Sequence, residues 1–138
     1  MSDVMTIQHQ GETYAMLFRK DLKTENGVAF PTTDDMPFQV GVFDRDTGYE
    51  VKPHRHPERD IQLTATTEFL YVVSGKIEMS IYDAEWNVLA KEVASAGDFI
   101  LLLAGGHSFT MLEPTRLIEI KQGPYPGKTD AKIFRDTL

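Results

Sequence analysis

The sequence contains no cysteine, which excludes disulfide bonds, thiolate metal sites and cysteine nucleophiles. Any metal ion must therefore rest on histidine, aspartate or glutamate. Basic residues are also in deficit, with 14 Lys and Arg against 21 Asp and Glu and a formal net charge of −7. Because phosphate backbones and anionic lipid surfaces repel such an acidic chain, we expect neither nucleic acid nor membranes as partners.

Long apolar runs are missing as well. The longest, FILLLA at residues 99–104, is far too short to span a bilayer. The first residues lack the basic start and continuous apolar core of a signal peptide, so we expect a cytoplasmic location. The 138 residues fit a single domain, residues 1–138, without repeats or a linker.

Helical periodicity is scarce, and short segments rich in β-branched and aromatic residues alternate with turn signals. This pattern predicts an all-β sandwich or barrel. Ser74 and Gly75 separate two apolar runs and predict a tight hairpin, in which glycine supplies the positive φ. In the second run Ile77, Met79 and Ile81 alternate with polar residues, as expected of a half-exposed strand. The strand segments are residues 38–43, 68–74, 76–82, 98–104, 107–112 and 116–121.

Two of these segments, FLYVV at residues 69–73 and FILLLA at residues 99–104, are apolar without alternation. Strands that are apolar on both faces need cover on both faces. A small barrel covers only its inside, so their outer faces are expected to pack against another sheet or a second subunit in a homodimer. The alternative is that the N-terminal forty residues fold over them.

The histidines of HRHPERD, His54 and His56, are the first candidate site residues. On an extended segment the i, i+2 spacing places both imidazoles on one face, with Arg55 on the other. In the neutral form each imidazole offers a lone pair to a divalent ion, so the pair provides half of a metal site.

A carboxylate ligand is expected to complete the histidine pair. Glu68 opens the apolar segment EFLYVV, where an inward charge is costly unless it is paired or ligated. Glu58 and Asp60 lie closer to the histidines in sequence, but Glu58 begins no apolar strand. Glu68 is therefore preferred, and the alternative is an ordinary charge at the end of a strand.

The spacing G-x5-H-x-H followed by E-x6-G resembles the first motif of the cupin superfamily, G-x5-H-x-H-x3,4-E-x6-G. The segment GDFILLLAGGHSFTM is similar to the second motif, G-x5-P-x-G-x2-H-x3-N. The resemblance covers residues 40–120 and leaves residues 1–39 as N-terminal strands or an arm and residues 121–138 as a tail. It implies a double-stranded β-helix, a jelly-roll-like barrel, and the tail is similar to that of cupins associated with surface-polysaccharide pathways. It also implies four metal ligands: His54, His56, Glu68 and His107.

The sequence departs from the cupin pattern at several points. Eleven residues separate His56 from Glu68 instead of three or four, which predicts that residues 57–67 form a loop at the mouth of the barrel. Leu103 stands in place of the proline, Met111 in place of the asparagine, and the histidine comes one residue early. A shift of one residue turns a side chain to the other face of a strand, so the glycines at 105 and 106 are expected to re-aim the chain.

Three imidazoles and a carboxylate suit Fe, Mn, Ni, Zn or Cu, and ligand type alone does not choose among them. The resemblance implies a metal-dependent protein acting on a small oxygen-rich molecule, sugar-like or an organic acid, as an isomerase, an epimerase or a dioxygenase. A non-catalytic, metal-dependent ligand-binding module is the alternative. A metal-free cupin with a histidine general base is a third possibility.

Glu119 and Lys121 alternate on one face of the segment RLIEIK together with Leu117. If that face points inward, the two charged residues are candidates for acid–base and anion-binding roles; if it points outward, they form a solvated edge. Weaker candidates are Arg55, Arg59, Tyr71 and Tyr82. His9 is expected on the surface and Trp86 at the tip of a turn.

Overall fold

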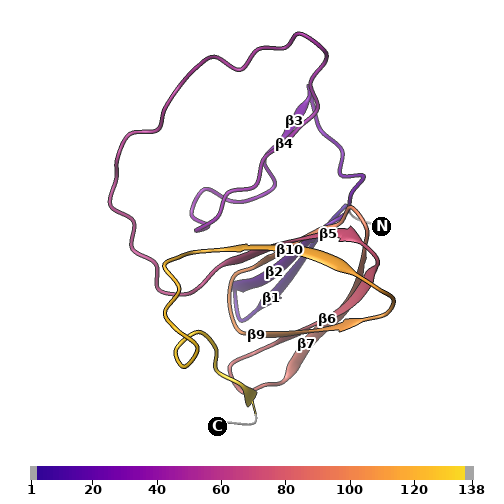
Figure 1. The fold of residues 1–138 in the computed structure, drawn as a ribbon, viewed down its shortest axis with the longest axis vertical. Helices are drawn as coiled ribbons and strands as arrows, with labels where there is room; N and C mark the ends of the chain where they lie inside the picture. Colours follow the sequence, from indigo (N-terminus) through magenta and orange to yellow (C-terminus); the bar gives the residue numbers. More distant parts are fainter. Residues whose placement is uncertain (1–2, 136–138) are drawn as a thin grey trace.

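The computed structural model describes residues 3–135 and shows an all-β chain with antiparallel strand pairing, as the sequence predicts (Figure 1). None of its described residues belongs to a helix long and apolar enough to cross a membrane. The strands are β1 (Val4–His9), β2 (Glu12–Phe18), β3 (Val28–Ala29), β4 (Val42–Phe43), β5 (Glu68–Ser74), β6 (Lys76–Tyr82), β7 (Val88–Ser95), β8 (Phe99–Leu102), β9 (Gly106–Met111) and β10 (Arg116–Lys121).

Two sheets enclose the main core. One has five strands in the order β1-β2-β8-β5-β10, and the other has three in the order β7-β6-β9. The alternation predicted for β6 is confirmed, because Ile77, Met79 and Ile81 are at most 1% exposed. They pack in one cluster with Leu70 and Val72 of β5, so the inner faces of the two sheets meet there.

The hairpin predicted at Ser74 and Gly75 is wrong. β5 pairs with β8 and β10, whereas β6 pairs with β7 and β9, so the connection crosses from one sheet to the other. Gly75 does adopt a positive φ of 90°, and a Cβ there would lie 2.4 Å from the carbonyl oxygen of Pro114. The glycine is thus required by a tight crossing between sheets, which carries the same local signal as a hairpin turn.

The outer face of the five-stranded sheet is covered at β2 and β8 by the chain's own N-terminal part. Phe38 and Val40 pack there with Phe18 and Leu101. The alternative that the N-terminal forty residues fold over the apolar strands is therefore confirmed for FILLLA. On β5 and β10 the outer face remains open, with Tyr71 and other apolar side chains exposed, namely Val73, Ile118 and Ile120.

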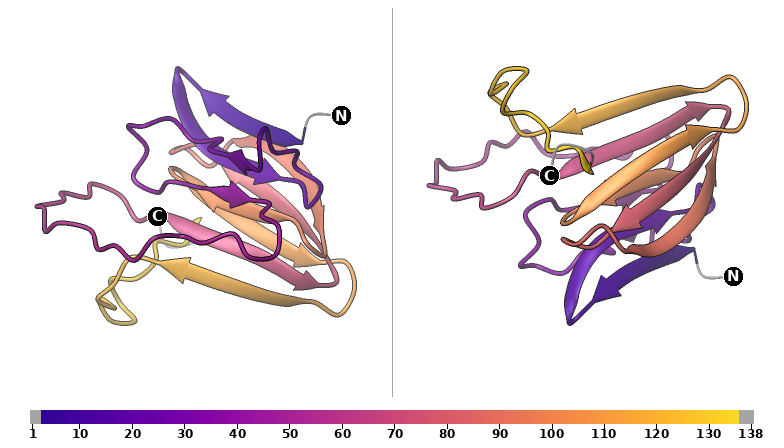
Figure 2. Two further views of the ribbon diagram at one scale, coloured as in Figure 1. Left: turned by 90° about the horizontal axis from the view of Figure 1, so that it is seen from above. Right: turned by 90° about the horizontal axis from the view of Figure 1, so that it is seen from below.

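Residues 44–66, which we call the histidine segment, connect β4 to β5. Every residue of the segment is exposed and none belongs to a strand. The loop predicted for residues 57–67 is thus confirmed as irregular chain, although Thr67 is buried. Figures 1 and 2 show the segment projecting away from both sheets, so it does not form the lip of a barrel mouth.

Candidate functional site

Glu68 is the first residue of β5 and points between the two sheets. It shares its strand face with Leu70 and Val72, which belong to the core cluster. Its side chain is only 14% exposed, and Oε2 lies 3.4 Å from Nε2 of His107. A carboxylate in this position loses most of its hydration, so its placement among apolar inner residues calls for a specific partner.

His107 also points inward. It lies opposite Ile81 of β6 in the antiparallel register, and directly opposed residues project to the same face of a sheet. Ile81 belongs to the core, so the imidazole faces the interior at the end of β9. The preceding Gly105 has a φ of 69°, which allows the bend that sets this register.

The pKa of His107 is lowered from its usual value. Burial is the main cause and the cations of Lys132 and Lys121 contribute, while the carboxylates of Glu68 and Glu119 act in the opposite direction. The imidazole is therefore neutral at physiological pH, which is the form that binds a metal ion or accepts a proton.

Glu119 and Lys121 lie on the inner face of β10. Lys121 stands opposite Glu68 in the strand register. Leu117 lies two residues before Glu119 on the same face and packs against the core. Nζ of Lys121 is 3.4 Å from Oε1 of Glu119. Both side chains are partly exposed, so the inner face of this sheet ends in a charged rim beside His107.

His54 and His56 are not part of this cluster. They lie on the exposed histidine segment, with ring centroids 5.4 Å apart. Nδ1 of His54 is 2.7 Å from the carbonyl oxygen of Lys52, which can only accept, so Nδ1 carries the hydrogen. In the neutral ring the lone pair then resides on Nε2, the arrangement that backbone carbonyls impose on metal-binding histidines.

The four expected ligands thus fall into two pairs, Glu68 with His107 between the sheets and His54 with His56 on the histidine segment. Among residues 3–135, no group of three or more His, Asp or Glu side chains is close enough to hold a metal ion. Glu58 and Asp60 also lie on the exposed histidine segment.

The weaker candidates lie elsewhere. Tyr71 is on the outer face of β5, and Tyr82 shares a hydrogen bond of 2.9 Å with Ser108. Trp86 lies in the turn between β6 and β7, as expected, and has a positive φ. His9 makes an edge contact with the ring of Tyr14 and is not fully exposed.

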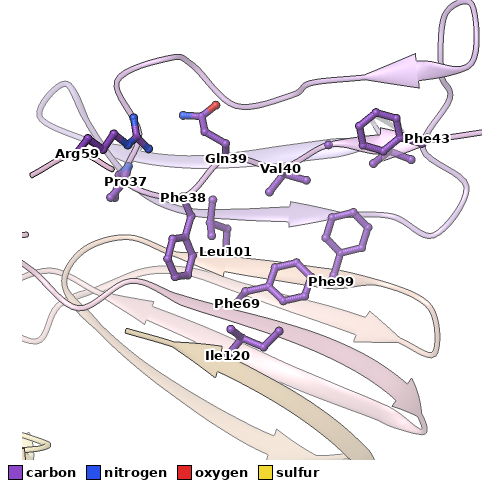
Figure 3. Close-up of a pocket in the computed structure, with 12 residues that line it drawn as sticks. Pro37, Phe38, Gln39, Val40, Phe43, Arg59, Phe69, Phe99, Leu101 and Ile120 are labelled. Atoms are coloured by element: carbon purple, nitrogen blue, oxygen red, sulfur yellow. The ribbon is translucent and has the colours of Figure 1, made fainter. Parts of the chain in front are cut away.

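A groove that the sequence did not single out runs along the outer face of the five-stranded sheet. It has a volume of ≈ 670 Å³, and residues 37–43 line one side of it. Figure 3 shows aromatic rings from β5 and β8 facing the segment at residues 38–40, with Arg59 at one end. The only signal for it was the lack of alternation in FLYVV and FILLLA, which called for an outer cover. The side chains that form the groove include Phe38, Val40, Phe69, Phe99, Leu101 and Ile120.

No protein-family model, curated protein or solved structure matches this chain.

Proposed function

We propose that this chain is a metal-binding cupin-like protein whose ligands are His54, His56, Glu68 and His107. The observation that carries the proposal is the contact of 3.4 Å between Glu68 and His107 on the inner faces of opposite sheets. A double-stranded β-helix is compatible with the two antiparallel sheets, and the proposal includes that finer assignment of the fold.

The donor set fits a divalent transition metal such as Fe, Mn, Ni, Zn or Cu. His107 is neutral because burial lowers its pKa, and the lone pair of His54 is directed to Nε2 by the Lys52 carbonyl. These two imidazoles are thus prepared to donate a lone pair to a metal ion. Glu68 supplies one negative charge, so an ion bound there would offset the desolvation of the carboxylate.

The substrate we propose is a small oxygen-rich molecule, sugar-like or an organic acid. A bound divalent ion would polarise a carbonyl or hydroxyl oxygen of that molecule. Lys121 is a donor for an anionic or hydroxyl group, and Glu119 beside it can take a proton from carbon and return it, as an isomerase or epimerase requires. A dioxygenase remains the competing reaction, and oxygen consumption distinguishes the two.

Metal analysis of the purified protein tests the ligand set. We expect stoichiometric metal in the wild-type protein and in Glu58→Gln, which removes a carboxylate of the exposed histidine segment. Glu68→Gln and His107→Gln should each lose most of the metal. A wild-type protein without metal, whose stability is unchanged by a chelator, would refute the proposal.

A second candidate function rests on the same contact. If no metal binds, Glu68 and His107 form an acid–base pair in which the carboxylate orients the imidazole. A metal-free wild-type protein would favour this candidate. A non-catalytic ligand-binding module would instead bind metal and ligand without any turnover.

A further inference from the structure

The histidine segment is bonded to the rest of the described chain only at its start, through Asp44 and Arg45. Between residues 46 and 66, no hydrogen bond or ion pair joins the segment to the rest of residues 3–135. It nevertheless carries large apolar side chains in solvent, with Val51 68% and Ile61 62% exposed. Loops of this length without secondary structure are uncommon in compact domains and usually have a function. The segment therefore has the composition of a chain that packs against another surface.

The two sheets leave matching surfaces open. β9 pairs only with β6, and β10 pairs only with β5, so both strands present a free edge in the described part of the chain. Free edges bind added strands readily through main-chain hydrogen bonds. These two edges flank the inner pair of Glu68 and His107.

The histidine segment fits the edge of β9 chemically. In an extended strand His54 and His56 face the same side, and Arg55 faces the other. Laid antiparallel along β9 with the histidines inward, the strand places both imidazoles next to His107. Neighbouring side chains on adjacent strands lie about 5 Å apart, which is within the reach of a shared metal ion.

Length does not prevent the segment from reaching its own barrel. The eleven residues between His56 and Glu68 extend to about 36–40 Å. The segment nevertheless projects away from both sheets of its own chain (Figure 1). The outer face of β5 and β10, where Tyr71, Ile118 and Ile120 are exposed, gives a second copy an apolar surface to rest on.

We propose that two copies of the chain exchange their histidine segments, so that each metal site combines His54 and His56 of one copy with Glu68 and His107 of the other. Reciprocal exchange is a low-cost route to a symmetric dimer because it reuses contacts that the fold already provides. The inference rests on the proposed metal site. It adds that neither copy holds a complete site alone.

Complementation in a mixed dimer tests the exchange. One copy carries His54→Ala with His56→Ala, and the other carries Glu68→Gln with His107→Gln; the two are co-expressed with different tags and the heterodimer is isolated. Exchange leaves one site of the heterodimer fully wild type and removes all ligands from the other. We expect half the metal per chain of the wild-type dimer in the heterodimer and none in either variant alone. Arg55→Ala paired with Thr110→Ala serves as the matched control and should keep full metal.

The outcomes separate the two proposals. If the wild-type protein binds metal and the heterodimer does not, the sites close within one chain and the exchange is overturned. A wild-type protein that binds metal as a monomer overturns it equally. If the wild-type protein binds no metal, the proposed function fails and the shared site fails with it.

Cross-linking gives a readout that does not depend on metal. The chain has no cysteine, so Lys52→Cys combined with Met111→Cys places the only two thiols on the histidine segment and on β9. A bis-maleimide should then yield covalent dimers on a denaturing gel. Internally linked monomers, or no link at all, would contradict docking of the segment on the partner's β9.

Discussion

Replacement of Glu68 by leucine should raise the stability of the metal-free protein. The side chain lies on an inner strand face with Leu70 and Val72 and is only 14% exposed. Replacing a buried ion pair by apolar residues of similar volume is neutral to about 4 kcal/mol stabilising, whereas removing one partner destabilises when the other is left charged. Loss of Glu68 leaves no unpaired charge, because burial lowers the pKa of His107 and keeps it neutral. His107 is neutral and Glu68 keeps some solvent, so we expect the low end, about 1 kcal/mol.

The expected gain in the free energy of unfolding corresponds to a measurable increase in the melting temperature, Tm. With an unfolding entropy of about 2.1 cal/mol/K per residue, 138 residues give about 0.29 kcal/mol/K. A gain of about 1 kcal/mol then corresponds to an increase in Tm of about 3 °C. Metal at about 100 times its dissociation constant stabilises the wild-type protein by about 2.7 kcal/mol, or about 9 °C, and leaves Glu68→Leu unaffected.

Adding metal should therefore reverse the order of the two melting temperatures. Thermal unfolding with a chelator, and with each of the candidate metals, measures both curves at one chain concentration. Glu58→Leu is the control and should follow the wild-type protein. If Glu68→Leu is less stable than wild type in chelator, or if metal raises its Tm as much, the carboxylate is a structural residue and the reasoning is refuted.

Three further predictions concern the framework of the site. Gly105→Ala should lower the free energy of unfolding in urea by about 1–3 kcal/mol, because φ is 69° and the new methyl would lie 2.2 Å from a carbonyl oxygen of β6. Gly11→Ala is the control and should lower it less, because the space around Gly11 is open. Asp98→Ala should cost about 2–4 kcal/mol, since the buried carboxylate accepts bonds from two backbone amides and a guanidinium; an unchanged urea midpoint would contradict this. The pKa of Asp83 is lowered, first by the side-chain hydrogen bond from Asn87. Its contribution to stability is therefore present above its unfolded pKa and is lost as the pH falls through the lowered folded value, so Asp83→Asn should flatten the acid side of a stability–pH curve.

The sequence predicted strand faces better than strand partners. The inner face of β6 followed from the alternation of Ile77, Met79 and Ile81, because side chains alternate along any strand whatever it pairs with. The partner of β5 did not follow, since Gly75 has a positive φ in a hairpin and in a crossing between sheets alike. Pairing depends on contacts far apart in the sequence, and a local pattern carries no information about them.

The candidate site was predictable to the same extent. The inward direction of Glu68 followed from its place at the start of an apolar strand, and the two glycines before His107 gave a reason for its register. The orientation of Glu119 and Lys121 stayed open because β10 has few buried residues, and it is decided by the register that sets Lys121 opposite Glu68. The position of the histidine segment was not predictable, because residues 44–66 form no strand and bury no face that a local pattern could signal.

Two unfavourable features of the single chain have one explanation in the shared site. Burial of Glu68 costs hydration free energy, and exposure of Val51 and Ile61 forgoes the gain of about 25 cal/mol for each Å² of apolar surface that they could bury. Neither feature helps a monomer without metal to fold. In the proposed shared site, a metal ion between two copies would offset the first, and docking of the histidine segment on β9 of the partner subunit would offset the second. The proposal therefore predicts that the stability of the protein rises with both metal concentration and chain concentration, because metal binding and dimer formation would each stabilise the folded state.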